Sequence, residues 1–95
     1  MKTKKRARAA IKPRIEFPRE GERLETDSYT ARIHAPDAVM VHAAVDQGEW
    51  RECRPSVGYW WFDWTEDEAG EHELIACASF EDGRESVSET VHCVR

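Results

Sequence analysis

The sequence of 95 residues has few of the features that mark a membrane protein, a nucleotide-binding enzyme or a secreted protein. No run of about 18 apolar residues occurs, so we expect no transmembrane helix. The amino terminus is basic but lacks the apolar stretch of about 7–15 residues that a signal peptide needs. The five glycines stand singly, which excludes the GxxxxGK and GxGxxG phosphate loops. These absences predict a small cytoplasmic protein.

Cysteine is also scarce. The chain has three cysteines, Cys53, Cys77 and Cys93, and no CxxC pair, so a zinc ribbon is excluded. An odd number at wide spacing predicts reduced thiols, although one disulfide with one leftover thiol stays open. By alternation His42 and Cys77 both face outward on their strands, and they would lie side by side if these strands are neighbours in one sheet, with His92 or Cys93 on the far side of Cys77. We nevertheless predict no bound metal ion, because nothing in the spacing demands a set of convergent ligands.

Lysine is absent after Lys12, and this absence reveals a split in charge. The first fourteen residues hold seven basic side chains and no acid, whereas the rest hold seven arginines against nineteen acids, a formal balance of −12. A folded body that binds nucleic acid through a basic face is therefore not expected. We predict a disordered basic tail over residues 1–13, which either contacts nucleic acid, a membrane surface or the acidic body, or serves only for solubility.

From residue 14 onward, apolar and polar residues alternate with period two, and turn residues recur every 8–12 positions. The pattern predicts about seven strands, over residues 14–17, 23–34, 38–45, 49–54, 59–64, 71–80 and 85–94. No helical repeat of apolar residues is found. We therefore predict an all-β fold, an antiparallel immunoglobulin-like β-sandwich formed by residues 14–95.

Four tryptophans are the most prominent feature of the predicted sandwich. Alternation places Trp60, Phe62 and Trp64 on the inward face of one strand, and Trp50 is also expected in the core. Tyr59 and Trp61 have the opposite parity and should face outward. They are the candidate partner-binding residues, because exposed aromatic side chains anchor protein partners or stack on sugar rings.

Three segments resemble a known family. They are VHAAVDQGEWREC (residues 41–53), WWFDW (60–64) and GEHELIACASFEDGR (70–84). Together they are similar to immunoglobulin-like domains of the E-set type, and above all to the dimerisation domain of sulfite-oxidase-like molybdopterin enzymes. Cys77 stands where that family usually has Arg, and Phe80 where it usually has Asp. The resemblance implies a sandwich fold and a tendency to self-associate, and it does not imply oxidase chemistry.

No nucleophilic, phosphate-binding or paired-carboxylate constellation accompanies this pattern. We therefore predict a non-enzymatic module without cofactors that mediates protein–protein interaction or forms a homodimer. Nucleic acid could be contacted only through the basic tail. The alternative is a carbohydrate-binding β-sandwich module that uses the exposed Tyr59 and Trp61 as a stacking platform.

Overall fold

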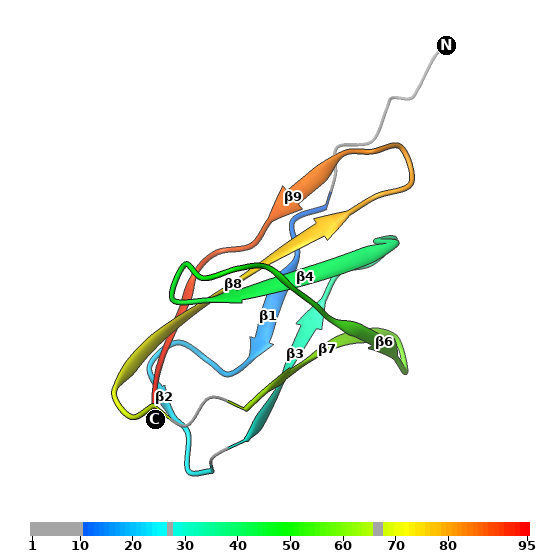
Figure 1. The fold of residues 1–95 in the computed structure, drawn as a ribbon. Helices are drawn as coiled ribbons and strands as arrows, with labels where there is room; N and C mark the ends of the chain where they lie inside the picture. The colour runs from blue at the N-terminus through cyan, green and yellow to red at the C-terminus, as the bar shows by residue number, and fades with distance from the viewer. Residues whose placement is uncertain (1–10, 27, 66–67) are drawn as a thin grey trace.

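The computed structural model describes residues 11–26, 28–65 and 68–95. These residues form two β-sheets that pack face to face (Figure 1). The four-stranded sheet has the order β1-β3-β7-β6, with bounds Arg14–Phe17, Tyr29–His34, Tyr59–Trp64 and Arg54–Ser56. The six-stranded sheet has the order β2-β10-β8-β4-β5, with bounds Glu22–Arg23, Val91–Val94, Glu71–Ser79, Met40–Val45 and Arg51–Glu52. Its sixth strand, β9 (Glu85–Val87), pairs with β8. The predicted all-β, two-layer architecture is confirmed.

The prediction of an entirely antiparallel sandwich is wrong at one point. Strands β2 and β10 run parallel, with Cys93 opposite Glu22 and Val94 opposite Arg23. The pairing continues past β2, because the Leu24 amide donates to the Val94 carbonyl at 2.7 Å. The six-stranded sheet is therefore mixed.

The structure has ten strands in its described residues instead of about seven, because three predicted strands are broken. At Leu24 and again at Cys53 the chain leaves the six-stranded sheet, and both side chains are buried where it crosses to the other sheet. At Ser88 the last predicted strand divides into β9 and β10. There the Ser88 hydroxyl accepts from the Ala76 amide at 2.9 Å and donates to the Glu89 carbonyl at 2.8 Å, which interrupts the regular ladder.

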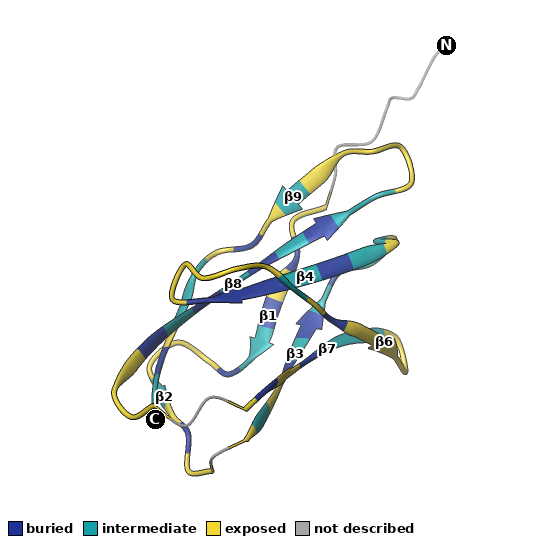
Figure 2. Ribbon diagram, in the orientation of Figure 1, coloured by how far each residue is buried: buried dark blue, intermediate teal, exposed yellow. Residues whose placement is uncertain are grey.

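The core lies between the sheets, where buried residues alternate with more exposed ones along the central strands (Figure 2). Phe62 and Trp64 are buried as predicted, and Trp60 is partly buried and packs against the core. Strand β8 lies within the predicted strand at residues 71–80, and its alternate residues His72, Leu74, Ala76 and Ala78 are buried. The burial pattern of this long strand is the clearest case of period two in the molecule.

Trp50 was expected in the core, and this expectation is wrong: its side chain is 48% exposed. The register places Arg51 opposite the buried Ala43, so Arg51 takes the inward position and lies over the Phe62 ring at 5.4 Å. Trp50 precedes β5 and is left outside. Val39, which has the same parity as the buried Val41 and Ala43, precedes β4 and is 56% exposed.

Residues 1–10 of the predicted tail lie outside the described residues. The remainder of the predicted tail lies against the body, because Pro13 is buried and Lys12 forms an ion pair with Glu89. Within the described ranges, no helix is long and apolar enough to cross a membrane.

Candidate functional site

Tyr59 and Trp61 lie on the outer face of the four-stranded sheet, as alternation predicted. Trp61 is opposite Arg32 of β3, and Arg32 is in turn opposite Phe17 of β1. A row of aromatic and arginine side chains therefore runs across three strands. We call Phe17, Arg32, Tyr59 and Trp61 the aromatic row.

Contacts within the aromatic row hold its side chains in place. The Arg32 guanidinium lies 4.8 Å from the Phe17 ring centroid and 4.4 Å from that of Tyr59, both within the range of cation–π attraction. The Trp61 indole donates its Nε1 hydrogen to the Ser56 carbonyl at 2.9 Å. The rings of Tyr59 and Trp61 are 6.0 Å apart and meet at 70°. The two rings therefore do not form one flat platform, and Arg32 covers part of Tyr59.

The charges on this face are paired with one another. Arg54 donates two hydrogen bonds to the Asp63 carboxylate, at 2.8 and 3.1 Å. Arg14 and Arg32 both contact the Glu16 carboxylate at 2.9 Å. The hydrogen bond from Arg54 lowers the pKa of Asp63, and the bond from Arg14, followed by the charge of Arg32, lowers that of Glu16. The face therefore presents aromatic and guanidinium groups without a strong excess of either charge.

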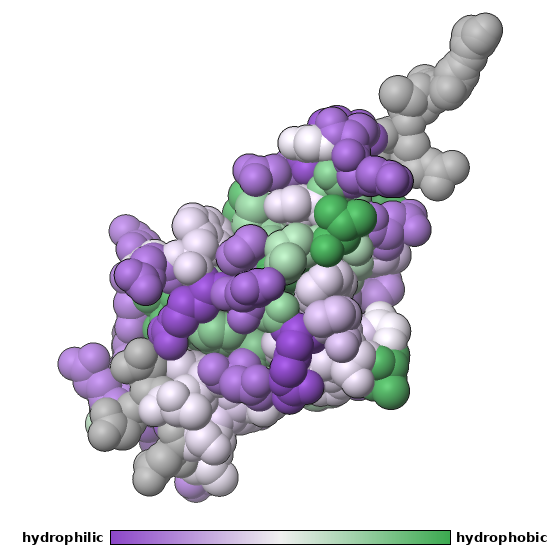
Figure 3. Space-filling view, turned by 45° about the vertical axis from the view of Figure 1, so that its right-hand side comes forward, coloured by the Kyte–Doolittle hydropathy of each residue, from purple (hydrophilic) through white to green (hydrophobic). Residues whose placement is uncertain are grey.

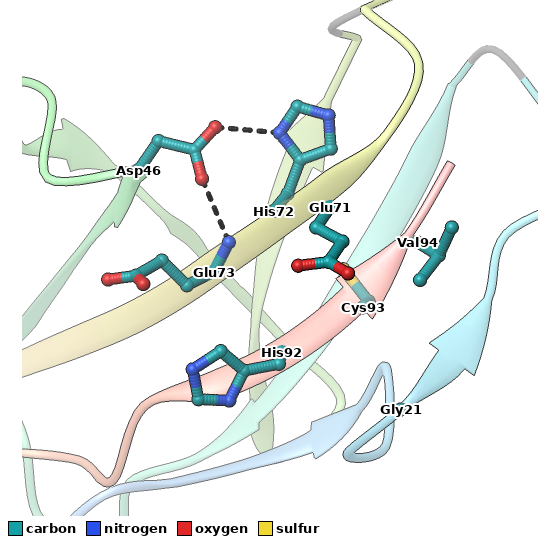
Figure 4. A pocket seen from close by; sticks show the side chains of 8 residues that line it. All are labelled: Gly21, Asp46, Glu71, His72, Glu73, His92, Cys93 and Val94. Carbon is teal, nitrogen blue, oxygen red and sulfur yellow. Dashed lines mark hydrogen bonds and ion pairs between the residues drawn. The ribbon is translucent and has the colours of Figure 1, made fainter.

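A second feature is the buried His72 at one end of the sandwich, which lines a pocket with Asp46, Cys93 and neighbouring residues (Figure 4). Its Nδ1 lies 2.6 Å from an oxygen of Asp46, and its Nε2 lies 2.8 Å from the Glu68 carbonyl. The other Asp46 oxygen accepts from the Glu73 amide at 2.9 Å. The His72 ring also packs nearly at right angles to the Trp64 ring, with centroids 5.3 Å apart.

The two partners of His72 are both acceptors, so both ring nitrogens must carry hydrogen for both bonds to form. Burial by itself lowers the pKa of His72, but the hydrogen bonds to Asp46 and Glu68 outweigh it, and the pKa is raised above its usual 6.5. The arrangement stabilises an imidazolium and leaves neither nitrogen available to a substrate. His72 is therefore suited to joining the turn after β4 to β8, and not to acid–base catalysis.

His42 and Cys77 face each other across β4 and β8, which confirms that these residues are neighbours. The expectation that His92 or Cys93 would border Cys77 is wrong, because Cys77 is opposite Val87 of β9 and Cys93 is opposite His72. The break at Ser88 explains the error, since it moves β10 to the far end of β8. In the described residues, no three His, Cys, Asp or Glu side chains converge as ligands for a metal ion.

All three cysteines are free thiols, and two of them are buried. Burial raises the pKa of Cys53 to about 12 and that of Cys93 to about 11. Burial also raises the pKa of the partly buried Cys77. Because the thiolate is the reactive form, this environment suppresses nucleophilic chemistry at each of the three positions.

Sequence reasoning identified Tyr59 and Trp61 but missed Phe17 and Arg32 of the same row. Their proximity depends on cross-strand register, which alternation within one strand does not contain. The partnership of Asp46 with His72 was missed for the same reason. No protein-family model and no curated protein matches this chain.

Proposed function

We propose that this chain is a non-catalytic, immunoglobulin-like module that binds a protein partner, or a second copy of itself, through the aromatic row. The observation that carries the proposal is the row itself, in which Phe17, Arg32, Tyr59 and Trp61 lie side by side on one sheet face. Aromatic residues and arginine are enriched at protein interfaces, and Trp, Tyr and Arg dominate their binding energy. The ring and guanidinium contacts hold these groups in place before binding, which reduces the entropy lost on association.

The edges of the four-stranded sheet are poorly suited to strand addition, which favours its face. Edge strand β6 contains Pro55, which has no amide hydrogen to donate to an added strand. The other edge strand, β1, lies between the buried residues Pro13 and Pro18. A partner of this sheet therefore meets side chains and not unpaired backbone.

The turn between β6 and β7 extends the same surface. Val57 is 81% exposed there and has a φ of +46°, a conformation that β-branched residues rarely adopt. Gly58 follows with a φ of +85°, so the two residues match a turn that favours Asn-Gly. An exposed apolar side chain in a strained position is explained if Val57 contacts a partner.

The non-catalytic part of the proposal rests on the chemistry of the candidate nucleophiles and bases. Both nitrogens of His72 are occupied, and the thiols of Cys53 and Cys93 have strongly raised pKa values. The immunoglobulin-like part rests on the two packed sheets and on the sequence resemblance of residues 41–53, 60–64 and 70–84.

Light scattering at several protein concentrations tests self-association, and Trp61→Ala is the variant to compare. Trp50→Ala is the matched control, because Trp50 is exposed but is not part of the four-stranded sheet. If the chain dimerises, Trp61→Ala should weaken the dimer at least tenfold, as expected for a Trp worth over 1.4 kcal/mol at an interface, whereas Trp50→Ala should not.

If the chain is a monomer, the same pair of variants is compared in affinity capture from a source lysate. Specific loss of captured protein with Trp61→Ala supports the proposal, and identical behaviour of wild type and Trp61→Ala in both assays would refute it. Titration of tryptophan fluorescence with soluble glucans tests the carbohydrate alternative, and a saturable change would replace the proposal.

A further inference from the structure

The outer face of the six-stranded sheet carries an open groove that the proposed function does not use. Its lining residues come from β4, β8, β9 and the segment before β5, and they are His42, Trp50, Cys77, Ser79, Glu85 and Val87. His42 is opposite Cys77, and Cys77 is opposite Val87, so the floor of the groove crosses three strands. Figure 3 shows hydrophobic side chains on this side of the molecule lying between hydrophilic ones.

The groove is apolar at its two walls. Trp50 is 48% exposed and Val87 is 43% exposed, so two large apolar side chains flank the floor and remain in contact with water. Covering them with another apolar group would remove that surface from water, which is favourable. The groove therefore favours a ligand with some apolar side chains.

Negative charge lies around these apolar walls. Glu85 lines the groove, Glu52 is opposite His42 and shares its outward direction, and Glu49 precedes Trp50. Within the described part of the chain, none of these three carboxylates takes part in an ion pair. On the opposite face of the sandwich, Glu16 and Asp63 are both paired with arginines. The unpaired carboxylates favour a cationic ligand.

One segment of this chain has the required composition. Residues 1–11 have the sequence MKTKKRARAAI, with five basic side chains, no acid, and apolar residues at the end nearest the body. The segment also joins the body at a suitable place. The next residue, Lys12, pairs with Glu89, which is two residues beyond Val87. The segment is therefore attached close to β9, a strand that lines the groove.

The length of the segment is sufficient. From β9 across β8 and β4 to β5 there are three inter-strand spacings, which is about 14 Å. Eleven residues in extended conformation span up to about 36 Å. The attachment at Lys12 keeps the segment at a high effective concentration near its own groove, which favours it over the same segment of a second copy.

We propose that residues 1–11 dock into the groove of their own chain, with basic side chains at Glu52 and Glu85 and apolar side chains against Trp50 and Val87. The basic tail is then an internal ligand of the acidic body. Any external basic segment that uses the groove must displace it. The proposal does not depend on the aromatic row, which lies on the other sheet.

The test compares full-length wild type with a full-length chain in which the five basic residues of the segment are neutralised. The changes are Lys2→Gln, Lys4→Gln, Lys5→Gln, Arg6→Gln and Arg8→Gln. The readout is the NMR signal of the Trp50 indole, assigned through Trp50→Phe. The Trp61 indole is the internal control, because it lies on the opposite face and donates to the Ser56 carbonyl.

We expect the Trp50 signal to differ between the two chains while the Trp61 signal stays the same. High salt should move the wild-type Trp50 signal toward that of the neutralised chain, since exposed ion pairs are screened. A peptide of residues 1–11 added to the neutralised chain should restore the wild-type position. The double substitution Glu52→Gln with Glu85→Gln should lower the affinity for that peptide about fivefold, as expected for the loss of two exposed ion pairs. The control pair Glu25→Gln with Glu71→Gln should leave the peptide affinity unchanged.

Two results would overturn the proposal. One is a Trp50 signal that is the same in wild type and the neutralised chain. The other is a difference that disappears on dilution of the wild type, which would assign the groove to the tail of a second copy.

Discussion

The substitution Asp46→Asn tests whether the imidazolium of His72 stabilises the fold. Asn keeps the shape of Asp46 and tolerates its φ of +53°, and its carbonyl oxygen can still accept from the Glu73 amide. It removes the charged acceptor 2.6 Å from His72 Nδ1. A hydrogen bond to a charged group contributes about 1.5–3 kcal/mol. Because the Asp46 side chain is 45% exposed, solvent screening reduces this to about 1 kcal/mol.

The sign of the pH dependence follows from the direction of the pKa shift. The pKa of His72 in the folded chain is raised above 6.5, its usual value and the value expected after unfolding. The imidazolium therefore contributes its full stabilisation below pH 6.5, and this contribution is lost as the pH rises through the folded pKa. The difference in unfolding free energy between wild type and Asp46→Asn should be largest near pH 6 and should shrink toward zero at alkaline pH.

Urea denaturation followed by tryptophan fluorescence, at pH 6 and pH 9, measures this difference. Asp37→Asn is the matched control, because Asp37 is an exposed aspartate that also has a positive φ, of 67°, but forms no hydrogen bond or ion pair with a histidine among the described residues. NMR titration of His72 gives its pKa directly in both variants. An equal loss of stability at the two pH values, or a His72 pKa at or below 6.5 in wild type, would refute the reasoning.

Three further predictions concern packing, backbone strain and thiol exposure. Trp64→Ala should lower the unfolding free energy by about 3–5 kcal/mol, because Trp64 is fully buried. Trp50→Ala should change it by less than about 1 kcal/mol, because Trp50 is exposed. Equal losses for the two variants in urea denaturation would contradict the observed orientations. Val57→Asn should raise the unfolding free energy by about 1 kcal/mol, because Asn adopts the positive φ of this position with less strain than Val. A destabilised variant would show that residue 57 does not have a left-handed backbone conformation. In the native state Cys77 should react with a thiol reagent well before the two buried cysteines, and simultaneous reaction of all three thiols would show that the core opens as a unit.

Elements with a single strong alternation could be predicted from the sequence. The strand at residues 59–64 was predicted with the bounds that β7 has, and its alternation gave the outward direction of Tyr59 and Trp61. Alternation indicates the inward face of β8 in the same way, because the small or apolar residues Leu74, Ala76 and Ala78 occupy every second position after His72. In both strands the buried face is continuous, so period two is an unambiguous guide.

Points where the chain changes sheets could not be predicted in this way. Leu24 and Cys53 are apolar and continue an acceptable alternation, yet each lies where one strand ends and the next begins in the other sheet. The same lack of register information misplaced Trp50, since its direction depends on the pairing of Arg51 with Ala43. The strand break at Ser88 also depends on register, because the Ser88 hydroxyl can replace regular backbone pairing only where the Ala76 amide lies beside it.

The candidate surfaces differ in how far the sequence could identify them. Aromatic residues at alternating positions were enough to select Tyr59 and Trp61, but the contribution of Arg32 depends on its place between two rings from different strands. The groove depends on Trp50 being outside, which is the opposite of what hydrophobicity alone predicts for tryptophan.

The charge split in the sequence acquires a more specific meaning from the two sheet faces. On the four-stranded sheet, arginines neutralise the nearby acids, so an excess of negative charge does not accumulate around the aromatic row. On the six-stranded sheet, Glu52 and Glu85 have no cationic partner among the described residues, although they lie beside exposed apolar groups. A balance of −12 in residues 15–95 is therefore unevenly distributed, and the basic segment joins the body at Lys12, which pairs with Glu89 just beyond strand β9 of this sheet. A tail that served only for solubility would gain nothing from this position, whereas a tail that docks requires it.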